Sequence, residues 1–177
     1  MNLSEKKVTT KLAEYNEIKE LIKNNFPKDE RMSIDLLMFI TMFKGIDFTA
    51  YYDKDVFIGI TYTVKTRYTL YVLYLAISRN LQSSGYGSHI LDMLKDKSKE
   101  INKPITLFIE SVMNKSVDNY NQRIKRLSFY EKNGFINNNI KAIYDNIEYN
   151  IISTDKDLDV KKAQKVLAFT GAKIEEF

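Results

Sequence analysis

The residues best suited to bind a ligand lie in one polar loop, "QSSGYGS", from Gln82 to Ser88. The loop follows an apolar run and precedes an amphipathic pattern that begins near Ile90. Two glycines one residue apart permit tight curvature and close approach of a ligand. Amides in the first turn of a helix lack intrahelical acceptors and lie at its positive end. The pattern therefore predicts an anion site that suits a diphosphate.

Two familiar phosphate-binding loops do not match this stretch. A Walker loop requires Gly-Lys-Ser/Thr at its end, and here Ser88 follows Gly87. A dinucleotide-binding fingerprint requires a third small residue where Ile90 stands. Glu110 does lie at the end of the next strand, as that fingerprint requires. The meander of strands expected before the loop, however, does not match the fold of dinucleotide-binding proteins. A chance glycine turn at the start of a helix stays an alternative.

The first quarter of the chain predicts two helices. Apolar residues at helical spacing indicate a first helix that ends near Pro27, because proline disfavours helical geometry at the preceding residue. Ser33 is a good N-cap for a second helix, which we expect to run to Lys44 and Gly45. Because "IDLLMFITMF" is strongly apolar, we expect this second helix to be largely buried.

Three runs rich in β-branched and aromatic residues follow, "IDFTAYY", "DVFIGITYTVK" and "LYVLYLAI". Polar turns separate them, so they predict three strands in a meander. The third run is apolar on both faces, as expected for a central strand that is covered on both sides.

The second half of the chain predicts a crossover and a further hairpin. A helical stripe from Ile90 to Ile101 separates the strand at 70–77 from "PITLFIESV", so these two strands should lie parallel. "NQRIKRLSFYEKNGF" indicates a basic helix closed by Gly134 in the left-handed C-cap position. Strands "FINNNIKAIYD" and "IEYNIIST" follow, and residues 157–177 could add a C-terminal helix.

The order of these elements, with Gln-x-x-Gly-x-Gly after a buried strand and "FYEKNGF" after the next, resembles the GCN5-related N-acetyltransferase (GNAT) family. The resemblance covers roughly Val8 to Ile152. It implies a mixed α/β fold with a central, mostly antiparallel sheet of about six to seven strands. Helices should cover both faces, and a splayed parallel pair should lie in the middle. We expect a single domain over residues 1–177.

The resemblance also implies a cofactor site for acetyl-coenzyme A (acetyl-CoA). Main-chain amides of the loop would bind its diphosphate, which assigns that role to Gln82, Ser83, Ser84, Gly85, Tyr86, Gly87 and Ser88. The pantetheine arm would bind the backbone at the end of the preceding strand, at Leu75, Ala76 and Ile77. We expect no metal cofactor.

A tyrosine four residues before the Gly-Phe pair lies close to the departing sulfur in the family, and Tyr130 occupies that place. A phenol there could protonate the leaving thiolate, whose acid has a pKa of about 8.5 by analogy with cysteine. Alternatively, Tyr130 packs against the sheet with Leu127. The asparagine often found seven residues before this tyrosine is Arg123 here.

Glu110 ends the strand that should flank the thioester. An alkyl ammonium titrates near the pKa of lysine, about 10.4, so an attacking amine must first lose a proton. A carboxylate at this position could take that proton directly or through a water. Alternatively, Glu110 caps the following loop or pairs with a lysine.

Composition limits the remaining possibilities. The 177 residues include no cysteine, which excludes disulfides, thiolate metal sites and a cysteine nucleophile. The net charge of +4 is spread along the chain, which disfavours a nucleic-acid partner. No signal peptide or membrane span is evident, so we expect a cytoplasmic protein that binds no membrane.

These observations predict an N-acetyltransferase that acts on a primary amine of a small molecule or peptide, with Tyr130 as general acid. A non-catalytic acyl-CoA-binding module is the alternative, and a basic nucleic-acid binder ranks last. The C-terminal segment could dock on a neighbour, which would make a homodimer.

Overall fold

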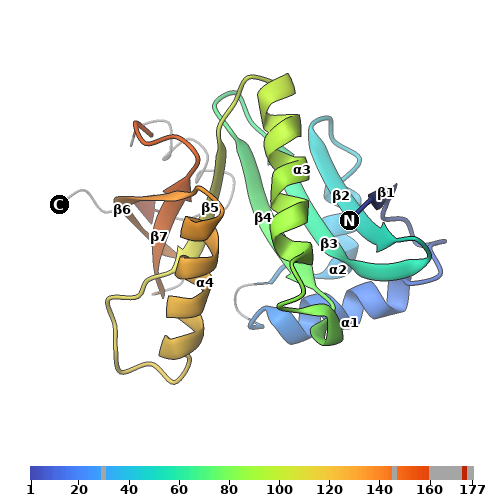
Figure 1. Ribbon diagram of the computed structural model, residues 1–177, viewed down its shortest axis with the longest axis horizontal. Coiled ribbons are helices and arrows are strands. Elements are labelled where there is room, and N and C mark those ends of the chain that lie inside the picture. Colours follow the sequence, from blue (N-terminus) through green and yellow to red (C-terminus); the bar gives the residue numbers. More distant parts are fainter. Residues whose placement is uncertain (29–30, 145–146, 160–172, 175–177) are drawn as a thin grey trace. The chain divides into compact units, whose positions relative to one another are not determined.

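The computed structural model describes residues 1–28, 31–144, 147–159 and 173–174. The chain forms two compact units (Figure 1). Unit one comprises Met1–Lys65 and Val72–Leu94, and unit two comprises Thr66–Tyr71 and Lys95–Phe177. The expectation of one domain stays a prediction, and most of the helix expected at 157–177 lies outside the described residues.

Unit one contains the first strands and helices of the chain. They are β1 (Leu3–Lys7), α1 (Tyr15–Asn25), α2 (Ile34–Ile40), β2 (Ile46–Asp53), β3 (Val56–Lys65), most of β4 (Leu70–Ile77), the short 3-10 helix η1 (Arg79–Leu81) and the first part of α3 (Tyr86–Glu100). β1 pairs with β2 and β2 with β3, in both cases antiparallel. The three predicted strands are therefore confirmed. The sequence did not predict β1, because "LSEKK" has a single buried apolar residue, Leu3.

The two helices before β2 differ in how well the sequence predicted them. α1 spans the expected residues, but α2 ends at Ile40 and only Leu37 within it is buried. Short-range turn hydrogen bonds, from Met42 N–H to the Phe39 carbonyl among others, replace the helix after that point. The expectation of a largely buried helix is wrong, because a helix of seven residues turns one narrow stripe toward the sheet. Four apolar side chains of this segment are exposed: Leu36, Phe39, Met42 and Phe43.

Helices lie on both faces of the strands in unit one. In Figure 1, α3 passes in front of the strands and α2 lies behind them. On the α2 side, the Tyr62 hydroxyl donates to the Leu37 carbonyl oxygen over 3.0 Å, and the ring of Tyr74 lies 4.7 Å from that of Phe26. α3 contributes buried Ile90, Leu91 and Leu94. Apolar burial of this kind is the main stabilising contribution to the fold.

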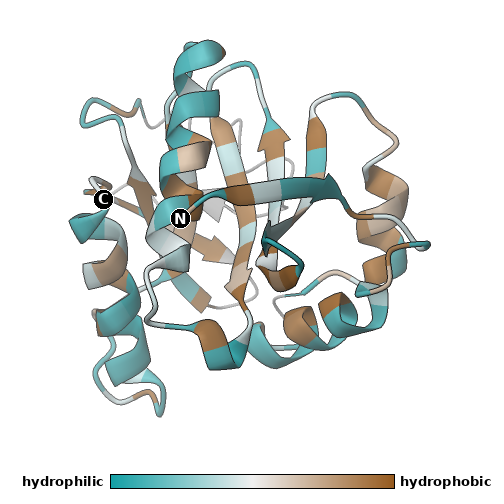
Figure 2. Cartoon of the chain, turned by 45° about the vertical axis from the view of Figure 1, so that its right-hand side comes forward, coloured by the Kyte–Doolittle hydropathy of each residue, from teal (hydrophilic) through white to brown (hydrophobic). Residues whose placement is uncertain are grey.

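Unit two contains β5 (Ile105–Glu110), α4 (Tyr120–Lys132), β6 (Ile136–Tyr144), β7 (Ile147–Ser153) and β8 (Lys173–Ile174). β7 pairs antiparallel with both β5 and β6, and β6 pairs antiparallel with β8. Figure 2 shows hydrophilic residues along most of α4, as expected for a helix with one packed face.

The first residues of β4 pair parallel with β5, through Leu70↔Ile105 and Tyr71↔Thr106. The hydrogen-bonded strand order is β1-β2-β3-β4-β5-β7-β6-β8. The predicted mixed, mostly antiparallel sheet with one parallel pair is thus confirmed, and the described residues form eight strands because β1 and β8 add to those expected. No helix in the described ranges has the length and apolar character needed to cross a membrane.

Candidate functional site

The predicted anion loop joins β4 to α3 within unit one. After η1 the chain reverses through Ser83 and Gly85, whose φ angles are 62° and 86°. Glycine adopts this left-handed region readily, whereas Ser83 does so at a cost of about 1–2 kcal/mol. α3 then begins at Tyr86, so the loop leads directly into the first turn of a helix of 15 residues.

The main-chain amides of this loop are available for a ligand. In the described part of the chain, none of the amides of residues 83–88 donates a hydrogen bond to a protein acceptor. The next amide, that of His89, donates to the Gly85 carbonyl oxygen over 3.1 Å and so starts the helical pattern. A row of unpaired N–H groups at the positive end of a helix suits a diphosphate. The loop predicted from sequence therefore fits the group that the resemblance implies.

Two side chains hold the ends of the loop. Gln82 Nε2 donates to the Ile77 carbonyl oxygen over 3.2 Å, which ties the loop back to the end of β4. The Tyr86 hydroxyl donates to Asp53 Oδ2, at the end of β2, over 3.0 Å. Sequence reasoning identified Gln82 and Tyr86 but missed Asp53, because nothing in the sequence pairs residues 33 positions apart.

Leu75, Ala76 and Ile77 form the last part of β4. Ala76 and Ile77 are buried and Leu75 is half-buried. Leu70 and Tyr71 form the parallel pairing with β5, so these three residues lie beyond it along β4. The next residue, Ser78, has a buried hydroxyl oxygen with no hydrogen-bond partner among the described residues.

Glu110 lies at the end of β5 in unit two, where its side chain is only 5% exposed. Its carboxylate contacts three donors from one stretch of chain. Asn119 Nδ2 lies 2.8 Å and Arg123 Nη2 3.0 Å from Oε1, and Arg126 Nη1 contacts Oε2. These contacts tie the end of β5 to the first turns of α4. Glu110 is therefore paired, as one sequence alternative expected, but with arginines rather than a lysine.

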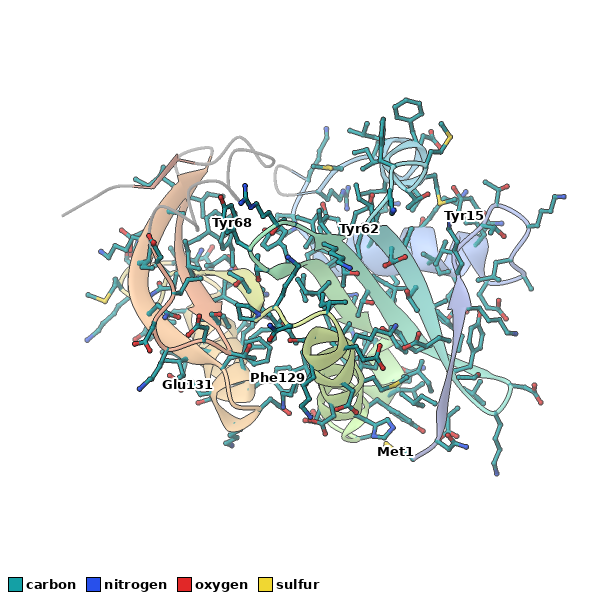
Figure 3. All side chains as sticks on the ribbon, turned by 90° about the horizontal axis from the view of Figure 1, so that it is seen from above. Met1, Tyr15, Tyr62, Tyr68, Phe129 and Glu131 are labelled. Carbon is teal, nitrogen blue, oxygen red and sulfur yellow. The ribbon has the colours of Figure 1, made fainter. Side chains whose placement is uncertain are left out.

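Tyr130 lies on α4, between Phe129 and Glu131, which are labelled in Figure 3. Its ring packs edge-on against Phe129 and Phe135, with centroids 5.1 Å and 5.5 Å away. Burial raises the pKa of Tyr130 to about 12, and the positive charge of Arg126 partly opposes that shift. The phenol is therefore a neutral hydrogen-bond donor at physiological pH.

Arg126 is the residue that sequence reasoning missed in unit two. It contacts Glu110 directly, and its charge acts on Tyr130, so it links the two predicted catalytic residues. Its place four residues before Tyr130 puts both side chains on one face of a helix, which is the signal that could have identified it. The loop and this pair belong to different units, and the structure describes each separately.

Among the described residues, no group of three or more histidine, aspartate or glutamate side chains is placed to hold a metal ion.

Comparison of the sequence with protein-family models and with curated proteins gives no match. Comparison with solved structures gives many matches. One is a protein from Bacteroides thetaiotaomicron assigned to the GNAT acetyltransferases, with 19% identity, 94% of each chain covered and a TM-score of 0.69. Another is a GNAT acetyltransferase from Elizabethkingia anophelis with acetyl-CoA bound, with 14% identity, 87% of this chain and 98% of that chain covered, and a TM-score of 0.62.

Arabidopsis thaliana Naa50, in complex with the bisubstrate analogue CoA-Ac-MVNAL, is similar at 20% identity and a TM-score of 0.62. The alignment covers 88% of this chain and 99% of that chain. These likenesses define the class of structure: the chain has the fold of the GCN5-related N-acetyltransferases.

Proposed function

We propose that this protein is an acetyl-CoA-dependent N-acetyltransferase whose acceptor is a primary amine on a small molecule or peptide. The observation that carries the proposal is the row of unpaired amides at residues 83–88, at the positive end of α3. The fold supports it, because similar structures hold acetyl-CoA or a CoA–peptide conjugate. The latter supports a peptide as one candidate acceptor.

In this proposal the loop holds the diphosphate through its main chain. Ser83, Ser84, Gly85, Tyr86, Gly87 and Ser88 supply the amides. Gln82 acts mainly by fixing the bend, since its side-chain amide already donates to the Ile77 carbonyl oxygen. The backbone of Leu75, Ala76 and Ile77 would hydrogen-bond the pantetheine arm. Acetyl-CoA supplies the acetyl thioester.

Tyr130 would serve as the proton donor for the departing sulfur. The amine nitrogen forms a bond to the thioester carbonyl carbon, the carbon–sulfur bond breaks, and the sulfur takes a proton from the phenol. The neutral state of Tyr130 supports this role, because only a protonated phenol can donate. The proton that the nitrogen loses passes to a base and finally restores the phenol.

A water or Glu110 is the candidate base. The three donors around the Glu110 carboxylate favour a pairing role for it, because its oxygens already accept strong hydrogen bonds. We therefore propose water as the first acceptor of the proton. Substitution of Glu110, described below, distinguishes the two.

Calorimetric titration with CoA and acetyl-CoA, followed by a thiol-release assay on a panel of amines, tests the function. We expect saturable binding of both compounds and release of free thiol with at least one amine. Binding without turnover across the panel would instead identify an acyl-CoA-binding module. Absence of CoA binding would refute the assignment of the loop.

A further inference from the structure

The loop of residues 82–88 is fixed at two points, and the second point is unexplained by the proposed function. The Gln82 side chain links the start of the loop to Ile77, the last residue of β4. The side chain of Tyr86 reaches instead to Asp53, on the end of β2. Asp53 is itself well anchored, since its backbone pairs with Leu3 on one side and Val56 on the other.

Between these two points, residues 83–85 lie outside the helix, and Tyr86 begins α3. The amides of residues 83–88 donate to no protein acceptor in the described ranges, and two of the residues have left-handed φ angles. An unrestrained loop loses backbone entropy for each residue that binding fixes. A loop that is already fixed before binding avoids that loss and binds more tightly.

The hydrogen bond also acts on the protonation state of the phenol. The bond to Asp53 is the main reason that the pKa of Tyr86 is raised. The phenol thus stays a donor to the carboxylate throughout the neutral range.

We propose that Asp53 and Tyr86 are positioning residues, whose hydrogen bond holds the amides of residues 83–88 in the geometry that binds a diphosphate. This inference rests on the proposed function. The two residues act through the backbone of the loop and have no part in acetyl transfer itself.

We call the hydrogen bond between Tyr86 and Asp53 the tether. Four variants test its role: Tyr86→Phe, Asp53→Ala, the double variant, and Asp55→Ala as a matched control. Tyr86→Phe removes the hydroxyl without changing charge. Asp55 is an exposed acid in the same hairpin, so its removal makes the same change in net charge as removal of Asp53. The dissociation constant of CoA is measured by calorimetry, and KM and kcat with acetyl-CoA are measured separately. Circular dichroism checks that each variant is folded.

We expect Tyr86→Phe and Asp53→Ala each to weaken CoA binding at least fivefold and to raise KM, with kcat unchanged at saturating acetyl-CoA. The double variant should be no weaker than the single variants, because both remove the same hydrogen bond. Asp55→Ala should bind CoA as well as the wild type or slightly better.

Three results would overturn the tether. They are a change of less than twofold in Tyr86→Phe, additive losses in the double variant, or an equal loss in Asp55→Ala. Wild-type protein that fails to bind CoA would refute the proposed function. Wild-type binding with unaffected variants would refute only the tether.

Discussion

The carboxylate of Glu110 accepts from Asn119, Arg123 and Arg126, which lie in and just before α4. The position of Glu110 at a strand end was readable from the sequence, but its partners were not. Their contact depends on how α4 is rotated against β5, which local patterns do not specify. Asn119 is likewise occupied, since its Oδ1 accepts from Arg123 Nε over 2.8 Å.

Replacement of Glu110 by glutamine should mainly destabilise the protein. It removes the charge that compensates two arginines at a buried site, at a cost of about 3 kcal/mol. We expect a lower urea midpoint and an unchanged shape of the pH profile of kcat/KM. Glu131→Gln, at an exposed position on α4, is the control. A normal midpoint together with a lost limb of the pH profile would identify Glu110 as the base.

Replacement of Tyr130 by phenylalanine should lower kcat by about 100-fold, within the range for loss of a general acid. Affinity for CoA should change less than twofold, because the phenol would act only on the departing sulfur. Calorimetry and steady-state kinetics on the same preparation separate these effects. Full activity from pH 6 to pH 10 would exclude Tyr130 as the proton donor.

At the scale of elements, local signals predicted most of the secondary structure. The N-cap Ser33, whose hydroxyl accepts from the Leu36 amide, and the glycine loop before α3 were both readable because each depends on neighbours in sequence. β1 and the exposure of α2 were not readable. Whether an apolar residue such as Phe39 finds a partner depends on tertiary packing rather than on its own type.

The loop itself gives a prediction at this scale. Gly85 has a φ of 86°, which a β-branched residue adopts only with strain, so Gly85→Val should distort the loop and weaken CoA binding more than tenfold. Gly134→Val is the matched control, because Gly134 has a φ of 80° and open space around it. The Gly134 variant should lose about as much stability as Gly85→Val and should keep its affinity for CoA. Equal affinities in the two variants would contradict the role of the loop.

At the scale of the whole molecule, the fold class could be predicted although the three similar structures described above are only 14–20% identical to this chain. The order of strands, glycine loop and basic helix carries that information, since topology depends on the pattern of apolar and polar residues more than on identities. Which amine the protein acetylates could not be predicted, because the chemistry of an acceptor site depends on side chains brought together from several elements.

Several buried tyrosines predict how the whole protein responds to alkali. Burial raises the pKa of Tyr52, Tyr62 and Tyr130 to about 12 and that of Tyr51 further. In the unfolded chain these tyrosines ionise near pH 10, so the unfolded chain holds fewer protons than the folded chain between pH 10 and 12. Stability should be fully present below pH 10 and fall as the pH rises through 12. Urea midpoints that stay constant from pH 9 to pH 11.5 would contradict this expectation.

The outward side chains of α2 and the turn after it bear on how the protein is assayed. Leu36, Phe39, Met42 and Phe43 are 44–73% exposed, and the rings of Phe39 and Phe43 lie 6.0 Å apart. Dyes such as ANS fluoresce on exposed apolar surface, so we expect a signal from the native protein before any melting. The chain contains twelve tyrosines and no tryptophan. Tyrosine emission therefore reports melting without interference from dye that is bound to the native protein.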